Sequence, residues 1–166
     1  MYARVVTSTF PVVLILCPPQ WGEGWVEDLD RQVGELFARK ERYALIIDAL
    51  HVAGVPSAKD RKHLTDWLTR PELLARQRRW NVGSSTILSS PLARGALQAV
   101  YWVWTPPAPQ HAARDLDDAW RWCLEKLRAE RIALPRPEAE LFDEVRRELR
   151  TFRDTVARGA ATPPRP

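Results

Sequence analysis

The segment Tyr43-Ala44-Leu45-Ile46-Ile47-Asp48-Ala49-Leu50 decides the fold class of this chain. It is a continuous apolar run with branched side chains, and it carries one carboxylate near its end. A run of this kind directly after a helix is typical of a strand buried on both faces of a parallel sheet. We therefore take residues 43–48 as the central strand of an α/β domain.

The residues before this run have the pattern of two strands and a helix. Residues 5–8 and 12–17 are short apolar segments separated by Pro11, as in two successive strands. Over residues 23–40, apolar side chains recur every three or four positions and the opposite face is charged, as in an amphipathic helix. The apolar positions of this helix are Trp25, Leu29, Val33, Leu36 and Phe37.

Helices and strands continue to alternate after the central strand. We expect a helix that begins at Pro56 or Ser57 and ends or kinks at Pro71, followed by a short helix over 72–79. A strand over 80–89 and a short helix after Pro91 should come next. The last elements of this part are a short edge strand over 110–114 and a helix capped by Asp115. This order predicts an α/β fold with a mostly parallel, four- to five-stranded sheet packed by helices.

An added C-terminal helix is expected after Pro137. Its apolar residues follow the spacing of a coiled-coil seam: Phe142, Val145, Leu149, Phe152 and Val156. Two heptads are too short to be stable alone, so the seam needs a second copy, another protein or the chain's own domain as its partner surface. We favour an intermolecular role, because the proline-rich segment before the helix leaves it free to move.

The chain divides into three parts on this reading. Residues 1–134 form the α/β domain, residues 135–158 form the amphipathic helix for docking or oligomerisation, and residues 159–166 form a disordered tail. A length of 166 residues, with 45% hydrophobic and 28% charged residues, agrees with one globular domain and a small appendage.

Cofactor and membrane signals are missing from the sequence. The cysteines Cys17 and Cys123 fit no metal-binding spacing, the three histidines are far apart, and the glycines form no phosphate-binding loop. The apolar run at residues 10–17 has eight residues and ends in Cys-Pro-Pro, whereas an export signal ends at a small-residue cleavage site. We expect no metal, no cofactor and no membrane partner, and a cytoplasmic location.

An enzymatic alternative rests on Asp48 and His51. The two residues are three positions apart at the carboxyl end of the central strand, where open α/β sheets bind ligands. A carboxylate that orients an imidazole is a general-base pair, although no nucleophile motif accompanies it. Asp48 can equally accept hydrogen bonds from backbone amides at the strand end.

A nucleic-acid alternative rests on three arginines. Arg76, Arg78 and Arg79 precede Trp80, and arginines beside an aromatic ring can hold phosphates and stack a base. Cations at a helix C-terminus are also favoured by the helix dipole alone. The 25 basic residues are interleaved with 21 acidic ones, which argues against a broad electrostatic footprint.

Aromatic residues offer a surface for a protein partner. Tyr101, Trp102 and Trp104 lie close together before a proline-rich connection and are candidates for an exposed aromatic patch. The same side chains can instead pack beneath Pro106 and Pro107. Both arrangements stay open at this point.

The order of elements resembles the STAS family, the anti-sigma-factor-antagonist fold, and more closely its SpoIIAA-like branch. The resemblance covers roughly residues 3–130. It rests on the central strand 43–48, the helix opening near Ser57, the strand ending at Ser89 and the helix starting at Asp115. It implies a non-enzymatic bacterial regulatory module that docks onto a protein partner and forms a homodimer or a complex. It also implies Ser57 as a phosphorylation site, although a helix N-cap alone explains a serine there.

Overall fold

A computed structural model of the chain describes residues 3–20, 23–52, 58–88, 90–91, 94–95 and 105–160. The strands are β1 (Arg4–Val6), β2 (Val12–Leu16), β3 (Tyr43–Asp48), β4 (Asn81–Ile87) and β5 (Gln110–Ala113). The helices are α1 (Trp25–Ala38), α2 (Ala58–Leu68), α3 (Pro71–Trp80), α5 (Leu116–Ala129) and α6 (Glu138–Ala160). The described elements follow the order expected from the sequence.

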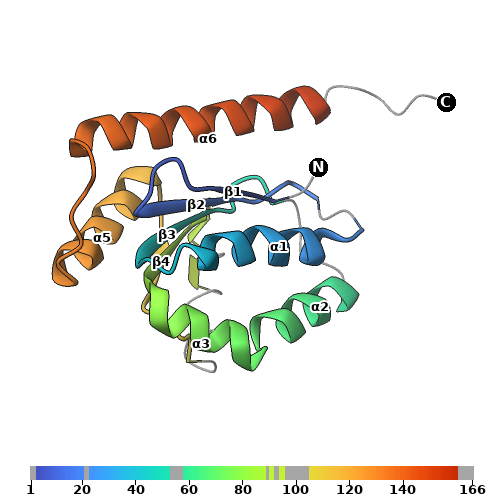
Figure 1. Cartoon of the computed structure of the whole chain (residues 1–166). Helices are drawn as coiled ribbons and strands as arrows, with labels where there is room; N and C mark the ends of the chain where they lie inside the picture. The colour runs from blue at the N-terminus through green and yellow to red at the C-terminus, as the bar shows by residue number, and fades with distance from the viewer. Residues whose placement is uncertain are drawn as a thin grey trace.

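The strands form one mixed sheet of five strands in the order β1-β2-β3-β4-β5 (Figure 1). The pair β1–β2 is antiparallel, and the other three pairs are parallel. The expectation of an α/β fold with a mostly parallel sheet is therefore confirmed. The run 43–48 is the middle strand, where Ile46 is paired with Leu14 on one side and Ser85 on the other.

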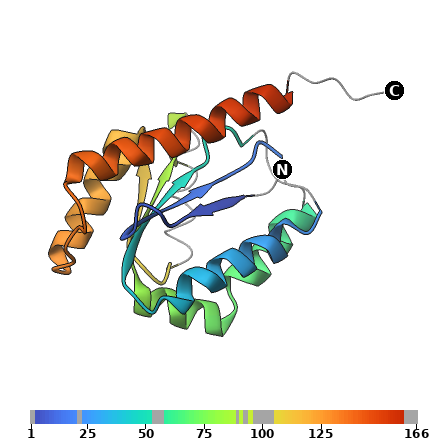
Figure 2. The same cartoon turned by 45° about the horizontal axis from the view of Figure 1, so that its top comes forward.

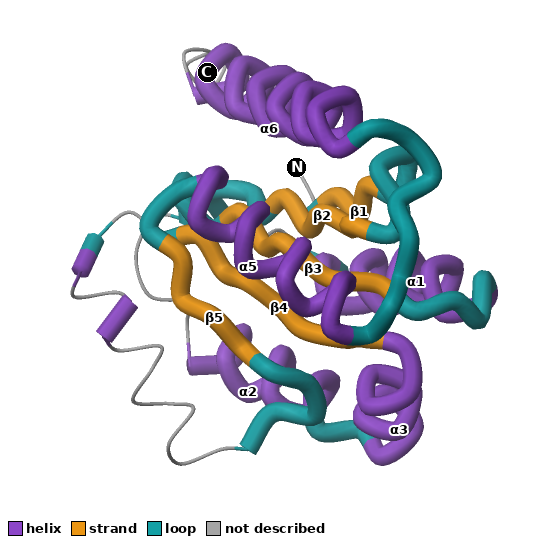
Figure 3. Tube along the Cα trace, turned by 90° about the vertical axis from the view of Figure 1, so that its left-hand side faces the viewer, coloured by secondary structure: helices purple, strands orange, loops and turns teal. Residues whose placement is uncertain are grey.

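Helices cover both faces of the sheet, because successive side chains of a strand point to opposite faces. Ala44 and Ile46 of β3 pack into the hydrophobic cluster formed with α5 and α6. Tyr43 of the same strand belongs to the second cluster, formed with α1, Trp67 of α2 and α3. Figures 1 and 2 show α6 and α1 on opposite sides of the sheet, and Figure 3 shows α5 lying across the strands.

The C-terminal helix corrects the expectation of an intermolecular seam. Val145, Leu149, Phe152 and Val156 are at most 9% exposed and are buried in the same cluster as Ile46 of the sheet. The helix packs back on its own chain because α5 leaves part of this face uncovered, and an apolar helix stripe is stabilised by the nearest apolar surface. These four residues are therefore not available to a partner in this arrangement.

The burial stripe of α6 also differs in one position from the predicted seam. Leu141 is fully buried, whereas its neighbour Phe142 is only partly buried and lies at the margin of the cluster. An α-helix has 3.6 residues per turn, so a straight helix on a sheet buries a wider stripe than the positions of a strict heptad. Phe142 thereby becomes a surface residue of the domain.

None of the helices that the structure describes is both long enough and apolar enough to cross a membrane.

Candidate functional site

The carboxyl edge of the sheet is occupied by a buried ion pair at Asp48. This residue ends β3 and is 2% exposed. The Arg153 side chain donates to its two carboxylate oxygens, from Nε at 3.1 Å and from Nη2 at 3.2 Å. The Leu50 amide adds a weaker hydrogen bond at 3.3 Å. A forked guanidinium pair of this kind compensates the charge that burial would otherwise penalise.

The structure does not join Asp48 to His51. His51 is exposed on the turn after β3, and no hydrogen bond or ion pair links these two described residues. The Asp48 carboxylate instead accepts hydrogen bonds from Arg153 of α6. The predicted general-base pair is therefore not formed, because a carboxylate bonded in this way does not orient an imidazole.

Arg153 is the residue of this edge that the sequence reading missed. It follows Phe152 directly and therefore borders the buried stripe of α6. A basic residue at the margin of an apolar stripe is the only signal that the sequence offers. The sequence cannot indicate which acid it meets, since Asp48 lies 105 positions away.

Cys17 lies next to this ion pair, and its thiol is unreactive. Its backbone N–H donates to the Asp48 carbonyl oxygen at 3.0 Å. Burial, with a smaller contribution from the Asp48 charge, raises the pKa of the Cys17 thiol to about 12. The thiol is therefore protonated at neutral pH, and a protonated thiol is neither a nucleophile nor a metal ligand.

The described residues contain no group of three or more metal-ligating side chains placed to hold an ion.

A second polar cluster lies between β4, β5 and α5. Ser85 and His111 are register partners on the neighbouring strands, and His111 Nε2 lies 3.4 Å from the Asp118 carboxylate. The His111 ring stacks on Trp122 with centroids 5.4 Å apart. Ser85 is fully buried, and its hydroxyl has no hydrogen-bond partner among the described residues. A serine closed off in this way cannot attack a substrate, so this triplet does not form a working nucleophile site.

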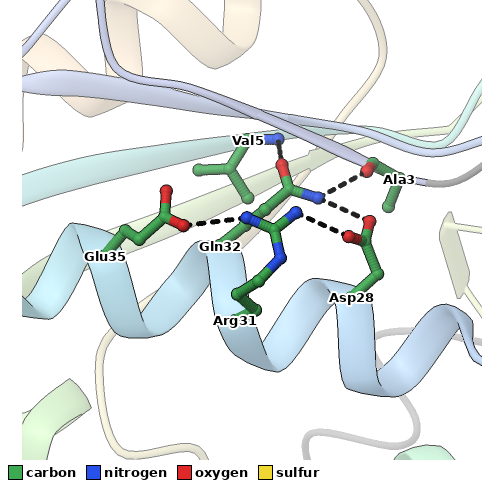
Figure 4. A network of polar contacts seen from close by, with 6 residues as sticks. All are labelled: Ala3, Val5, Asp28, Arg31, Gln32 and Glu35. Atoms are coloured by element: carbon green, nitrogen blue, oxygen red, sulfur yellow. Dashed lines mark hydrogen bonds and ion pairs between the residues drawn. The ribbon is translucent and has the colours of Figure 1, made fainter.

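The outer edge of β1 is closed by a side chain of α1 (Figure 4). The Gln32 amide oxygen accepts from the Val5 N–H at 2.8 Å, and its NH₂ group donates to the Ala3 carbonyl at 2.9 Å. The NH₂ group also donates to Asp28 at 2.8 Å, which holds the amide in place. These bonds use the backbone groups that an added strand would need. In this arrangement, the Val5 N–H and the Ala3 carbonyl are therefore already bonded and not free to pair with an added strand.

A shallow groove lies between α5 and the start of α6. Its volume is about 490 Å³. It is lined by Asp117, Trp120, Arg121, Leu124, Arg128, Glu138, Ala139 and Phe142. The lining therefore combines apolar side chains from both helices with charged side chains of both signs.

Two stacked aromatic rings belong to the lining of this groove. The ring centroids of Trp120 and Phe142 are 5.1 Å apart at an interplanar angle of 30°. Trp120 is buried, whereas Phe142 is partly exposed and lies under the Arg146 guanidinium at 4.2 Å. Phe142 is thus the one predicted seam residue that stays accessible.

Salt bridges account for most of the charges that border the groove. Arg128 is bonded to Glu138 at 2.8 Å, and Arg146 to Asp117 at 3.3 Å. Arg121 is exposed and forms no ion pair with another described residue. The groove therefore has a lining of apolar and charged side chains, in which Arg121 forms no ion pair with a described residue.

The remaining predicted site residues divide into two sets. Arg76, Arg78 and Arg79 are exposed on the last turns of α3. Ser57, Tyr101, Trp102 and Trp104 lie outside the described residues, so their predicted roles stay predictions.

The sequence matches no protein-family model, no curated protein and no solved structure at a significant level.

Proposed function

We propose that this chain is a non-enzymatic protein–protein interaction module of the STAS type, which acts as a cytoplasmic adaptor or regulator. The observation that carries the proposal is the groove between α5 and α6, with the stacked rings of Trp120 and Phe142 in its lining. The partner is a protein segment that places an apolar side chain against Phe142.

The composition of the groove supports a protein partner. Protein interfaces have an apolar centre rich in aromatic residues and arginine, surrounded by a polar rim. Phe142, Leu124 and Ala139 supply the apolar surface, and Arg121 supplies an unpaired donor beside it. The partner segment therefore carries a carboxylate near its apolar anchor.

The STAS assignment is supported by the order of the elements. A central strand, a following helix, a further parallel strand and the helix from Asp115 occur in the expected sequence. A phosphate on Ser57 would lie in sequence directly before α2, which starts at Ala58, and helix N-termini favour negative charge. Phosphorylation of Ser57 is therefore part of the proposal, as a means of regulating partner binding.

Site-specific photo-crosslinking tests the groove. A photoreactive amino acid at position 139 should crosslink one defined partner in cells of the source organism, because Ala139 lines the groove. The matched control carries the same amino acid at Arg150, which is exposed elsewhere on the same helix. The purified partner should bind the wild-type chain and lose about tenfold or more in affinity to Phe142→Asp, as expected when an aromatic anchor is removed.

The outcome is decided by the difference between the two crosslinking positions. Crosslinks of equal yield at 139 and 150, or a partner that binds Phe142→Asp as tightly as the wild-type chain, would show that the groove is not the docking surface. A circular-dichroism melt of Phe142→Asp shows whether the variant is folded under the binding conditions.

A further inference from the structure

The amino edge of the parallel sheet carries positive charge from two separate chain segments. Tyr43 and Asn81 are register partners at the start of β3 and β4, so the residues that precede them enter the sheet side by side. Residues 39–42 after α1 and residues 76–79 of α3 are thereby brought to one edge. The Arg76 guanidinium lies over the Phe37 ring of α1 at 5.9 Å, which shows that the two helix ends are in contact.

Acidic partners at this edge are few. Arg39 is paired with Glu41 at 3.6 Å, and Arg42 with Glu130 at 2.8 Å. The four other cations are exposed and form no ion pair with a described residue: Lys40, Arg76, Arg78 and Arg79. We call these four residues the cationic edge. The helix dipole of α3 accounts for a preference for Arg78 and Arg79, but it does not neutralise them.

Two arginines of the cationic edge lie over aromatic rings. The Arg79 guanidinium lies 4.8 Å from the Trp80 ring centroid, and the Arg76 guanidinium lies 5.9 Å from the Phe37 ring centroid. A cation–π contact of this kind restricts a guanidinium and does not use its N–H groups as a salt bridge would. Such a group can hold a phosphate through its N–H groups and stack an unpaired base on its outer plane.

The same stacking disfavours an acidic protein partner. A protein segment gains most of its affinity from an apolar anchor in a pocket. At the cationic edge Phe37 is 7% exposed and therefore presents little apolar surface, and the Arg79 guanidinium lies over the Trp80 ring. Among the described residues, the edge therefore offers charged guanidinium groups rather than an exposed apolar anchor.

We infer that the cationic edge binds the phosphate backbone of a single-stranded nucleic acid. Lys40, Arg76, Arg78 and Arg79 contact phosphates, and the stacked guanidinium planes of Arg76 and Arg79 accept unpaired bases. This surface is separate from the groove between α5 and α6 and does not depend on the protein partner proposed above.

Fluorescence anisotropy with labelled single strands of about 20 nucleotides, one of DNA and one of RNA, tests the inference. Four phosphate contacts at about −0.7 each predict a slope of the logarithm of the binding constant against the logarithm of the salt concentration near −3. Arg76→Glu combined with Arg78→Glu and Arg79→Glu should lower the affinity about tenfold or more and remove about two units of slope.

The matched control changes the same amount of charge elsewhere. Lys59, Arg147 and Arg150 are exposed on α2 and α6, and their combined change to Glu should leave the affinity within about twofold. Lys40→Asn gives a second variant that keeps the fold, because Lys40 has a φ of 55° and asparagine tolerates this left-handed backbone. It should lower the slope by about 0.7.

Three results overturn the inference. The first is no binding of either single strand at about 50 mM salt, where phosphate contacts are strongest. The second is an equal loss in the arginine triple variant and in the matched control. The third is arginine-dependent binding of polyglutamate or of anionic vesicles when neither single strand binds, which would assign the edge to an acidic protein or to a lipid surface.

Discussion

The charged residues at the two edges of the parallel sheet differ in burial and in ion pairing. At the carboxyl edge, the buried Asp48 carboxylate accepts two hydrogen bonds from Arg153, which lies 105 positions away in the sequence. At the amino edge, Lys40, Arg76, Arg78 and Arg79 are exposed and form no ion pair with a described residue. Open α/β sheets usually bind ligands at the carboxyl edge. In this chain, Asp48 at the described part of the carboxyl edge is bonded to Arg153 of α6. The cations without a described ionic partner lie at the opposite, amino edge.

The largest effect is expected from α6, the helix that packs on one face of the sheet and supplies Arg153. Leu149→Ala removes a side chain that is 2% exposed and leaves a cavity between α6 and the sheet. It should lower the free energy of unfolding by about 3–5 kcal/mol, measured by urea denaturation. The exposed neighbour Arg150→Ala is the control and should change it by less than about 0.5 kcal/mol. Equal effects of the two substitutions would mean that α6 is not part of the core in solution.

The second effect concerns the ion pair itself. Arg153→Ala leaves the Asp48 carboxylate buried without its cation, which costs about 3–5 kcal/mol in a fully buried pair. The Arg153 side chain is 33% exposed, so water takes part of its place and we expect a loss of about 2–3 kcal/mol. The readout is again the free energy of unfolding in urea.

A double variant isolates the charge from the packing of the arginine. Asp48→Asn added to Arg153→Ala removes the buried negative charge and should recover part of the lost stability. If the double variant is no more stable than Arg153→Ala, then Arg153 stabilises the chain by packing alone. The two edges of the sheet would then differ in the burial of their charged residues and not in charge pairing.

The third effect is a pH dependence at the carboxyl end of β5. Partial burial raises the pKa of Asp118, but the hydrogen bond from the Arg114 amide and the nearby His111 imidazole lower it by more. The net pKa lies below the ordinary value, so Asp118 stabilises the fold above its unfolded pKa. This stability is lost as the pH falls through the lower folded pKa.

Asp118→Asn tests this dependence. Unfolding in urea at about pH 6 and about pH 3 should show a smaller loss on acidification in the variant than in the wild-type chain, since the variant has no proton to take up at this position. An identical loss in both proteins would mean that other carboxylates cause the acid sensitivity.

Most of the fold could be predicted from local patterns. The run 43–48 is the central strand, the helices before and after it have the expected faces, and Asp115 caps α5 by accepting from the Asp118 N–H at 2.8 Å. These features depend on neighbouring residues, and their physics can be read from spacing and residue type. The same holds for the existence of α6 and its apolar stripe.

The candidate site could be predicted only in part, because its contacts are long-range. The spacing places Phe142 in the apolar stripe of the last helix, but its stacking on Trp120 depends on how α6 returns to the domain. The Asp48–Arg153 pair joins positions 105 residues apart. The unpaired state of Lys40 depends on the positions of all nearby acids, and no spacing rule gives those positions. A sequence reading counts charges, whereas a structure shows which of them are neutralised.

The smallest effect is expected when one cation is removed from the amino edge. Lys40→Asn takes away an exposed charge that forms no ion pair with a described residue, at a position where φ is 55°. Asparagine suits this backbone, so the free energy of unfolding should change by less than about 0.5 kcal/mol. Arg153→Ala at the other edge should cost several times more in the same urea titration. A loss above about 1 kcal/mol for Lys40→Asn would mean that Lys40 has an ionic partner in solution, because exposed and unpaired cations contribute less than this. The amino edge would then be neutralised like the carboxyl edge, and a smaller unpaired charge would remain there for an anionic ligand.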